Sequence, residues 1–441
     1  MANTYINRNF PSSGNRTTWT LSMWVKRSLT GSEQMLAHAY NGANDYTKIR
    51  FEGDDILTFE NYTGGTRDIA KRTNRKFKDT NGFYHLLFVN TPSAQTIYVN
   101  GVQETSWRTN TTGNVSTWWN HNISNTMFAS VNGGSLYFSG IVSHVHFCDG
   151  TALAPTVFGS TDSTTGEWSI NTSPSFTLGT NGFTILKDGN TITDQSTNSN
   201  AFTLGGGTIT TTKDCPDNVF ATLSPNILPR NSGGTISNGN LTFGTSAPQW
   251  TSESSAFGIT SGKYYFEVKL RDNGSDRRFR WGLQKNAEIT KTGNNQVLGG
   301  ANNNAIGYKT SGESATQGGY FINQTNTNLT DGDINENNAI YGFAIDLDNQ
   351  KMYGHFNGTW LHSGNPSSGT YGIDVSSFYT VGEPLFPSFT VHNSDIDINF
   401  GNGFFGTTAI SSAGTNASGI GIFEYDVPTG YTALSTKGLN L

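Results

Sequence analysis

The chain has 441 residues, a hydrophobic fraction of 34%, a charged fraction of 14% and a formal net charge of −6. This length exceeds what one hydrophobic core usually organises, so two domains are expected. The acidic balance offers no footprint for a phosphate backbone, which argues against a nucleic-acid partner, and no stretch reaches the ~20 apolar residues of a membrane span. The polar residues 1–10 predict no signal peptide.

Alternating apolar and polar residues predict a first series of strands. In residues 19–26, Leu21, Met23 and Val25 point to one side and Trp24 to the other. The same pattern recurs at residues 48–51, 56–59, 83–90, 96–99 and 135–147. Glycine, proline and asparagine pairs separate these segments, and short strands at such spacing predict a sandwich or barrel.

Apolar density then falls, and a second strand series follows. Residues 161–219 are rich in Ser, Thr, Asn and Gly and predict a partly ordered joint, in which residues 183–186 and 201–204 can form a small hairpin. The second series comprises residues 241–243, 263–270, 278–283, 305–308, 340–346, 351–356, 385–391 and 395–400. We therefore predict an all-β chain of two tandem β-sandwiches, at 1–160 and 220–405, with a C-terminal segment at 406–441.

Motifs of catalysis are missing from the sequence. It has no Gly-x-Ser-x-Gly elbow, no phosphate loop and no strand with the paired carboxylates of glycoside hydrolases. Cys148 and Cys215 have no second sulfur at metal-ligand spacing. We therefore predict a non-enzymatic binding protein that requires no cofactor. A polysaccharide-degrading enzyme stays as an alternative.

Two groups of residues in the first domain are candidates for binding. Trp118, Trp119 and Asn120 combine flat indoles with an amide, as sugar sites do, although consecutive strand residues face opposite ways and core packing is the alternative. A basic strip forms a candidate docking patch or a solvated strand face. It consists of Arg67, Lys71, Arg72, Arg75, Lys76 and Lys78.

Calcium is the one metal ion for which the sequence offers candidate ligands, because rim loops of jelly-roll lectins often hold it with oxygen ligands. Asp54 and Asp55 after Gly53 are the best donors, with Asp45 near in sequence, and a solvated turn is the alternative.

The second domain contributes four candidate binding residues. Arg278 and Arg280 alternate with Phe279 and Trp281, which predicts aromatic side chains inside and arginines outside. Trp360 follows an Asn-Gly turn and is expected near a loop tip as an exposed anchor. The candidates are Arg277, Arg278, Trp360 and His362.

Several segments resemble known families. NRTTWTLSMWVKRS, GFYHLLFVN with IYVNGVQE, and LYFSGIVSHVHFCDGTALAPTVFG resemble the concanavalin-like, laminin-G-type jelly roll over residues 1–160. GKYYFEVKL, YGFAIDLDNQKMYGHFNG and EPLFPSFTVHNSDIDINFGN resemble the SPRY fold over residues 220–405, which typically recognises protein or peptide through its loops.

The joint ITDQSTNSNAFTLGGGTITTTKDCPDNVFATLSPN and the ending VPTGYTALSTKGLNL are similar to segments found with this pairing in tailed bacteriophages, notably marine ones. The resemblance implies a virion surface protein made in a host cytoplasm. Its expected partners are a host-surface glycan or protein and other virion proteins. A tail adhesin and a capsid decoration protein both stay open, as does assembly into a homo-oligomer.

Overall fold

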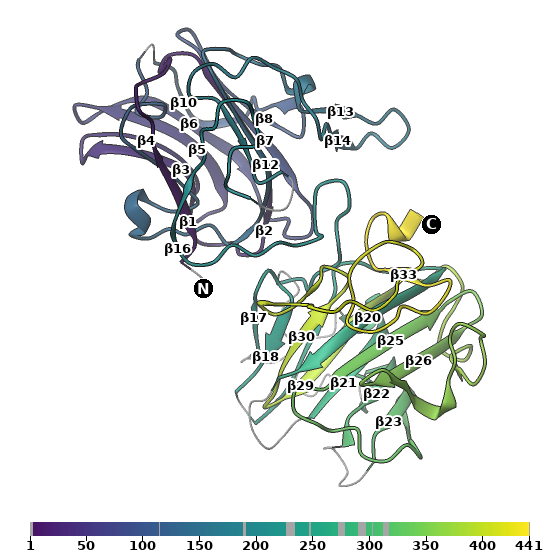
Figure 1. Cartoon of the computed structure of the whole chain (residues 1–441). Coiled ribbons are helices and arrows are strands. Elements are labelled where there is room, and N and C mark those ends of the chain that lie inside the picture. Colours follow the sequence, from purple (N-terminus) through teal and green to yellow (C-terminus); the bar gives the residue numbers. More distant parts are fainter. Residues whose placement is uncertain are drawn as a thin grey trace. The chain divides into compact units, whose positions relative to one another are not determined.

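The computed structural model describes residues 3–113, 115–187, 191–225, 234–246, 248–271, 278–289, 297–301, 303–311 and 317–440 (Figure 1). Contacts divide the chain into two compact units, which are Met1–Thr211 with Cys215–Asp217 and Thr212–Asp214 with Asn218–Leu441. In the part described, helix is limited to α1 (Asn286–Ile289) and short 3-10 turns. The predicted all-β fold with tandem sandwiches is therefore confirmed.

The first unit is built on two antiparallel sheets. The eight-stranded sheet has the order β10 (Trp107–Thr111), β6 (Thr66–Lys76), β5 (Ile56–Thr63), β4 (Asp45–Phe51), β3 (Gln34–Gly42), β11 (Ser124–Met127), β1 (Tyr5–Asn9) and β16 (Thr203–Gly206). The six-stranded sheet has the order β15 (Phe183–Ile185), β12 (Gly140–Asp149), β2 (Trp19–Arg27), β7 (Tyr84–Asn90), β8 (Gln95–Val99) and β9 (Val102–Gln103).

The core of the first unit lies between these sheets. Leu21, Met23 and Val25 of β2 are fully buried in it, as their alternation predicts. Trp24 points to the other face of the sheet and is also buried, stacked on His85 with ring centroids 4.9 Å apart. Both faces of β2 are therefore covered.

The second face of the six-stranded sheet is covered by the chain that follows β12. There η2 (Pro155–Val157) precedes a hairpin of β13 (Gly159–Thr161) and β14 (Trp168–Ile170). Trp168 stacks on His85 with centroids 5.9 Å apart, and its indole N–H donates to His85 Nδ1 at 3.0 Å. Gly101 is required below this indole, because a Cβ atom there would lie 2.4 Å from it.

The segment predicted as a joint contributes strands to the first unit. β15 pairs with β12 and β16 pairs with β1, so residues 183–186 and 201–204 extend the two sheets and do not pair with each other. The prediction of a small hairpin is wrong, because each segment finds a free strand edge. The contact division accordingly places the first unit's end near residue 211, beyond the predicted boundary at 160.

The second unit is also a sandwich. One sheet has the order β17 (Thr235–Ser237), β18 (Thr242–Gly244), β30 (Asp395–Asn399), β20 (Lys263–Leu270), β25 (Ile340–Asp346), β26 (Lys351–Phe356) and β27 (Thr359–Trp360), and β28 (Ile373–Asp374) and β33 (Thr432–Ala433) join at β26 and β20. The other has β19 (Trp250–Ser254), β29 (Leu385–His392), β21 (Arg278–Lys285), β22 (Ala305–Lys309), β23 (Gly319–Asn323) and β24 (Thr325–Asn328).

The C-terminal segment belongs to the second unit and covers the outer face of its first sheet. It carries the short strand β32 (Thr408–Ala409), which pairs with β31 (Phe404–Phe405) just before the segment, and then β33, which pairs with β20 in parallel. The buried carboxylate of Glu267 accepts hydrogen bonds from the backbone N–H groups of Glu424 and Tyr425 and from the hydroxyl of Tyr265. This network fastens the segment to the sandwich.

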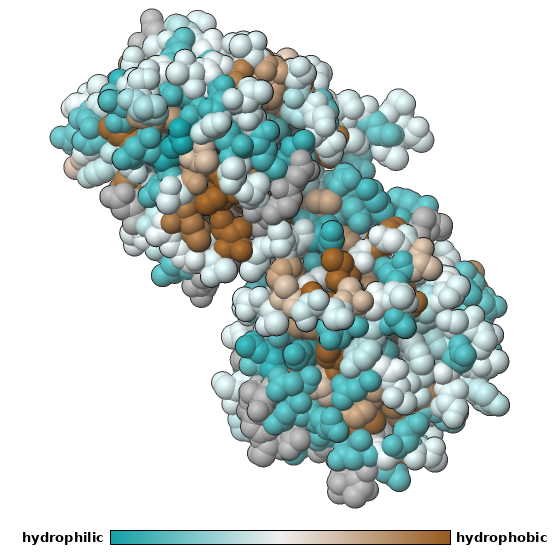
Figure 2. Space-filling view, in the orientation of Figure 1, coloured by the Kyte–Doolittle hydropathy of each residue, from teal (hydrophilic) through white to brown (hydrophobic). Residues whose placement is uncertain are grey.

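Hydrophilic and neutral side chains occupy most of the visible surface, and the hydrophobic residues form separate patches between them (Figure 2). This agrees with a low charged fraction that is compensated by Asn, Thr, Ser and Gly. Within the described part, none of the helices is long and apolar enough to cross a membrane.

Candidate functional site

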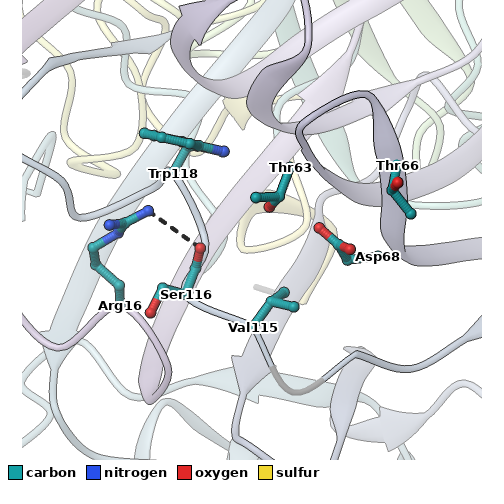
Figure 3. Close-up of a pocket in the computed structure, with 7 residues that line it drawn as sticks. All are labelled: Arg16, Thr63, Thr66, Asp68, Val115, Ser116 and Trp118. Carbon is teal, nitrogen blue, oxygen red and sulfur yellow. Dashed lines mark hydrogen bonds between the residues drawn. The ribbon is translucent and has the colours of Figure 1, made fainter.

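An open groove of about 500 Å³ lies on the first unit, between the β5–β6 hairpin and the chain that follows β10. Three stretches that are distant in sequence form it (Figure 3). Its lining residues are Arg16, Thr63, Thr66, Asp68, Val115, Ser116 and Trp118. The groove therefore includes one of the predicted binding residues, and all of its lining residues are described.

Trp118 is half-buried and held in one orientation. Its indole N–H donates to the carbonyl oxygen of Tyr62 at 2.9 Å, and its backbone N–H donates to Thr47 Oγ1 at 2.8 Å. The guanidinium of Arg16 lies 4.8 Å from the ring centroid, and the ring of His121 lies 5.4 Å away. Such an aromatic group contributes contact area at little cost in conformational entropy.

Arg16 is fixed beside the indole. Its Nε donates to the carbonyl of Thr117 at 2.6 Å, and its Nη2 donates to the carbonyl of Ser116 at 3.2 Å. Burial lowers the pKa of Arg16, but an arginine remains protonated in proteins. The side chain thus brings a preoriented positive charge with further N–H donors to one wall of the groove.

Asp68 lies on the opposite wall, at the start of β6 (Figure 3). Its Oδ2 accepts a long hydrogen bond of 3.4 Å from the amide of Asn61. The two walls approach closely because Gly113 packs on the Asp68 backbone, where a Cβ atom would lie 2.6 Å from the carbonyl oxygen. The wall around Asp68 also carries the exposed hydroxyl groups of Thr63 and Thr66.

Trp119 and Asn120 do not belong to the groove, so the prediction of a three-residue cluster is wrong beyond Trp118. Trp119 is 1% exposed and packs in the core against Phe147. Asn120 is fully buried, and its amide donates to Asp149 at 2.7 Å and to the carbonyl of Asn15 at 3.1 Å. Asn120 thereby fixes the segment that carries Arg16.

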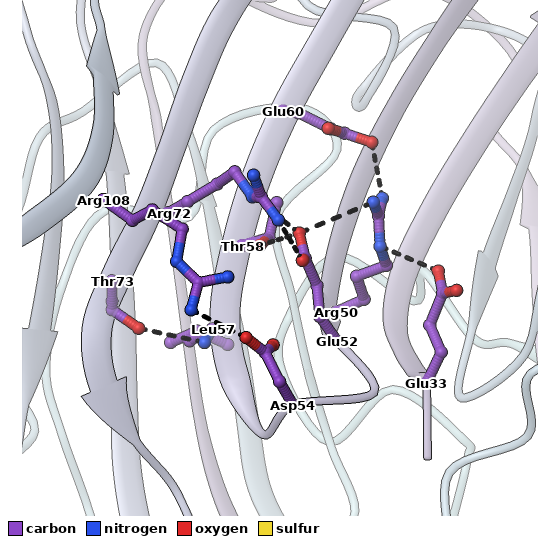
Figure 4. Close-up of polar contacts among 10 residues, drawn as sticks. All are labelled: Glu33, Arg50, Glu52, Asp54, Leu57, Thr58, Glu60, Arg72, Thr73 and Arg108. Carbon is purple, nitrogen blue, oxygen red and sulfur yellow. Dashed lines mark hydrogen bonds and ion pairs between the residues drawn. The ribbon is translucent and has the colours of Figure 1, made fainter. Parts of the chain in front are cut away.

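The six basic residues do not form one patch. Lys71 is buried and donates to Asn110 and Thr112. Arg72 pairs with Glu52 in a network of opposite charges on the outer face of the eight-stranded sheet (Figure 4). Alternation along β6 sends neighbouring side chains to opposite faces, which divides the strip.

The remaining members of the strip lie at its ends. Arg75 pairs with the buried carboxylate of Glu104 at 2.9 Å. Arg67, Lys76 and Lys78 are exposed. Arg67 is thus separated along the chain from Lys76 and Lys78 by members that are paired or buried.

The three candidate calcium ligands are not brought together. Asp45 begins β4, and Asp54 and Asp55 follow its other end, about 20 Å away at a rise of ~3.3 Å per residue. The carboxylate of Asp55 is buried and pairs with Arg27 at 3.0 Å, while Asp54 pairs with Arg108 at 2.7 Å. Among the residues described, no three His, Cys, Asp or Glu side chains gather as metal ligands.

In the second unit, Trp360 lies in β27 after the predicted turn, but its side chain is half-buried. Its ring meets His355 edge-on at 5.1 Å and lies 6.5 Å from Tyr265. It packs against the cluster that the C-terminal segment covers. Trp360 is therefore not the freely exposed anchor that the sequence predicts.

The other candidates of the second unit occupy different positions. His362 is exposed, and its backbone N–H donates to Asp331 at 3.0 Å. Arg278 begins β21 opposite His392 and is half-buried, whereas Arg277 lies outside the described residues.

The predicted alternation along β21 holds for the aromatic residues only. Phe279 and Trp281 are fully buried, as predicted. Arg280 is also buried, which is contrary to the prediction. Its Nη1 donates to the carbonyl of Leu298 at 2.6 Å, and its guanidinium lies 5.6 Å from the ring centroid of Phe321.

The sandwiches define an all-β protein whose first sandwich is a concanavalin-like jelly roll. Residues 2–158 match a family model of the concanavalin A-like lectin/glucanases superfamily. A search of curated proteins found no match.

Solved structures resemble parts of the chain. Domain 4 of AbnA, a GH43 extracellular arabinanase from Geobacillus stearothermophilus, in complex with arabinotriose, is 19% identical over 34% of this chain and 66% of that domain (TM-score 0.26). The SPRY domain of human HERC1 is 10% identical over 37% and 91% (TM-score 0.27). Domains LG4-5 of the mouse laminin alpha1 chain are 8% identical over 87% and 78% (TM-score 0.28).

Proposed function

We propose that the first unit binds carbohydrate in the groove around Trp118 and that the protein is a non-enzymatic adhesion protein. The observation that carries this proposal is the immobilised, half-buried indole of Trp118 in a groove that also holds a hydrogen-bond donor, Arg16, and an acceptor, Asp68. An aromatic surface with a few convergent polar groups is the general composition of a small-molecule site. Sugar rings offer apolar C–H groups to the part of the indole that Arg16 does not cover, and hydroxyl groups to Arg16 and Asp68.

The absence of catalysis is part of the proposal. Glycoside hydrolysis generally uses two carboxyl groups that flank the scissile bond. Asp68 is the one carboxylate among the lining residues of the groove. Purified protein should therefore release no reducing ends from any polysaccharide that it binds, and turnover that a single Asp or Glu substitution abolishes would contradict this.

Binding is tested by screening the full chain against an array of oligosaccharides and then measuring affinity by calorimetry. Trp118→Ala should weaken binding at least about tenfold, which corresponds to ~1.4 kcal/mol. Tyr371→Ala is a matched control, because Tyr371 is an aromatic residue of the other unit with 70% exposure. Equal affinities for wild type and Trp118→Ala, with folding intact, would refute the site.

We further propose that this adhesion protein works on a virion surface, at the tail or, as the alternative, as a capsid decoration protein. The support is the resemblance of the joint and the C-terminal ending to bacteriophage segments. Copy number per particle separates the two locations, since a decoration protein is present in many more copies than a tail adhesin. Absence of this protein from purified particles would refute both locations.

A further inference from the structure

The two walls of the groove carry opposite charges that do not neutralise each other. Arg16 is held by the carbonyls of Ser116 and Thr117 and by the indole of Trp118. Asp68 is anchored on β6. Both residues are described, and no ion pair within 4.0 Å joins them. The fixed positions keep the charges apart, and both residues line the space in which a ligand would lie (Figure 3).

The hydrogen-bonding capacity of the two walls is complementary. A guanidinium has five N–H donors and no acceptor. Arg16 uses two of its nitrogen atoms for backbone carbonyls, which leaves donors on Nη1. An ionised carboxylate is an acceptor only, and Oδ1 of Asp68 has no hydrogen-bond partner within the described structure. A ligand that bridges the walls must accept from one side and donate to the other.

A sugar hydroxyl both donates and accepts, so two hydroxyl groups on neighbouring carbons meet this requirement. A carboxylate on the sugar would be attracted by Arg16 and repelled by Asp68. An ammonium group would be repelled by Arg16 and attracted by Asp68. In either case the opposing Coulomb interactions largely cancel, while the charged group still loses its hydration.

We propose that the groove selects a neutral sugar with neighbouring hydroxyl groups over sugars that carry a carboxylate or an amine. This inference rests on the proposed function and names the ligand class of the same site. Arg16 donates to one hydroxyl oxygen, Asp68 accepts from the other hydroxyl, and Trp118 supplies the apolar contact. Asp68 is therefore the residue that excludes acidic sugars.

The test compares matched sets of neutral, uronic-acid and amino oligosaccharides on the full-length protein. Wild type should bind the neutral member at least about tenfold more tightly than either charged one. Its affinity should change less than about twofold between roughly 0.1 and 1 M salt, because screening acts on charged ligands.

Asp68→Asn keeps the size of the side chain and removes its charge, so the ratio of acidic to neutral affinity should rise at least about tenfold. Arg16→Gln should shift preference toward the amino sugar, and it keeps the proposal testable if the first variant fails to fold. Asp79→Asn is the control, because Asp79 is an exposed aspartate beyond the far end of β6.

Two results are distinguishable. In the first, Trp118→Ala abolishes binding, but wild type shows no preference for neutral sugars or Asp68→Asn leaves that preference unchanged. This result overturns the proposed selectivity and leaves the groove as a sugar site. Failure of wild type to bind every probe, or binding that Trp118→Ala does not affect, overturns both this inference and the proposed function.

Discussion

The buried ion pair between Arg27 and Asp55 should control the stability of the first unit. Arg27 is fully buried and Asp55 is 3% exposed, and Arg27 Nη2 lies 3.0 Å from Asp55 Oδ1. Removing one member of a buried pair leaves an uncompensated charge and typically costs 3–5 kcal/mol. Asp55→Asn is the informative change, since Asp55 has a φ of 68° and asparagine tolerates this left-handed conformation.

The expected cost of Asp55→Asn is about 3 kcal/mol, the lower end of that range. An asparagine oxygen can still accept from Arg27, whose Nη1 also donates to the carbonyl of Phe77 and whose guanidinium lies 4.3 Å from the ring centroid of Phe51. For a unit of this size the melting temperature should fall by roughly 6–12 °C. Urea denaturation followed by a probe in the first unit gives the free energy directly.

Asp54→Asn is the matched control, because its pair with Arg108 is partly exposed and should contribute less than about 1 kcal/mol. The experiment also tests calcium. A bound ion would stabilise wild type by mass action, so chelation would lower its melting temperature and Asp55→Asn would lose this response. A loss below about 1 kcal/mol for Asp55→Asn, with or without chelator, would refute the ion-pair argument.

Three further predictions concern two buried ionisable groups and one half-buried indole. Burial lowers the pKa of His85 to about 3, so its stabilisation is complete above the ordinary pKa near 6.5 and is lost as pH falls; of the stability that the first unit loses between pH 7 and pH 5 in denaturant titrations, His85 should account for about 2 kcal/mol, and His38 and His146, whose pKa values burial also lowers to about 3, should add to that loss. Burial raises the pKa of Glu267 to about 7, so its contribution is complete below about pH 4.5 and is lost as pH rises through 7; Glu267→Gln should flatten that slope in denaturant titrations. Trp360→Ala should destabilise the second unit by about 2 kcal/mol, since the indole packs against the cluster under the C-terminal segment, and unchanged hydrogen exchange there would contradict this.

Local patterning predicts strands well because side-chain alternation is a property of short segments. Residues 19–26 and 340–346 correspond to β2 and β25, with apolar residues toward the core. Prediction failed where a segment completes a structure formed elsewhere in the chain. The two segments that form β15 and β16 are short and lie among polar residues. They are strands only because they pair with the free edges of β12 and β1.

The groove was predictable only in part, for a related reason. Trp118 stands out by residue type, yet Arg16 is 101 positions from its hydrogen-bond partner Thr117. Asp68 has no local motif around it, and the sequence offered no signal for either residue. The prediction of calcium ligands failed for the opposite reason, since Asp45 and Asp55 are close in sequence but are separated in space by the length of β4.

The end of the first unit gives the last prediction. A fragment of residues 1–211 should fold, and one of residues 1–160 should not. Truncation at 160 removes four core residues from the first unit, which are Phe183, Ile185, Leu186 and Phe202. At about 1.5–3 kcal/mol for each buried side chain the loss is about 6–12 kcal/mol, which is comparable with the whole stability of a typical domain.

Truncation at 160 also uncovers the edges of β12 and β1, which exposes unpaired backbone groups and favours aggregation. Both fragments would be expressed and compared by size-exclusion chromatography and near-ultraviolet circular dichroism. A full-length variant with Phe183→Ala and Phe202→Ala is the control for the core contribution, because its backbone pairing is kept. A monomeric, cooperatively unfolding 1–160 fragment would show that the later strands are dispensable, and the first unit would then end where the sequence alone had placed its boundary.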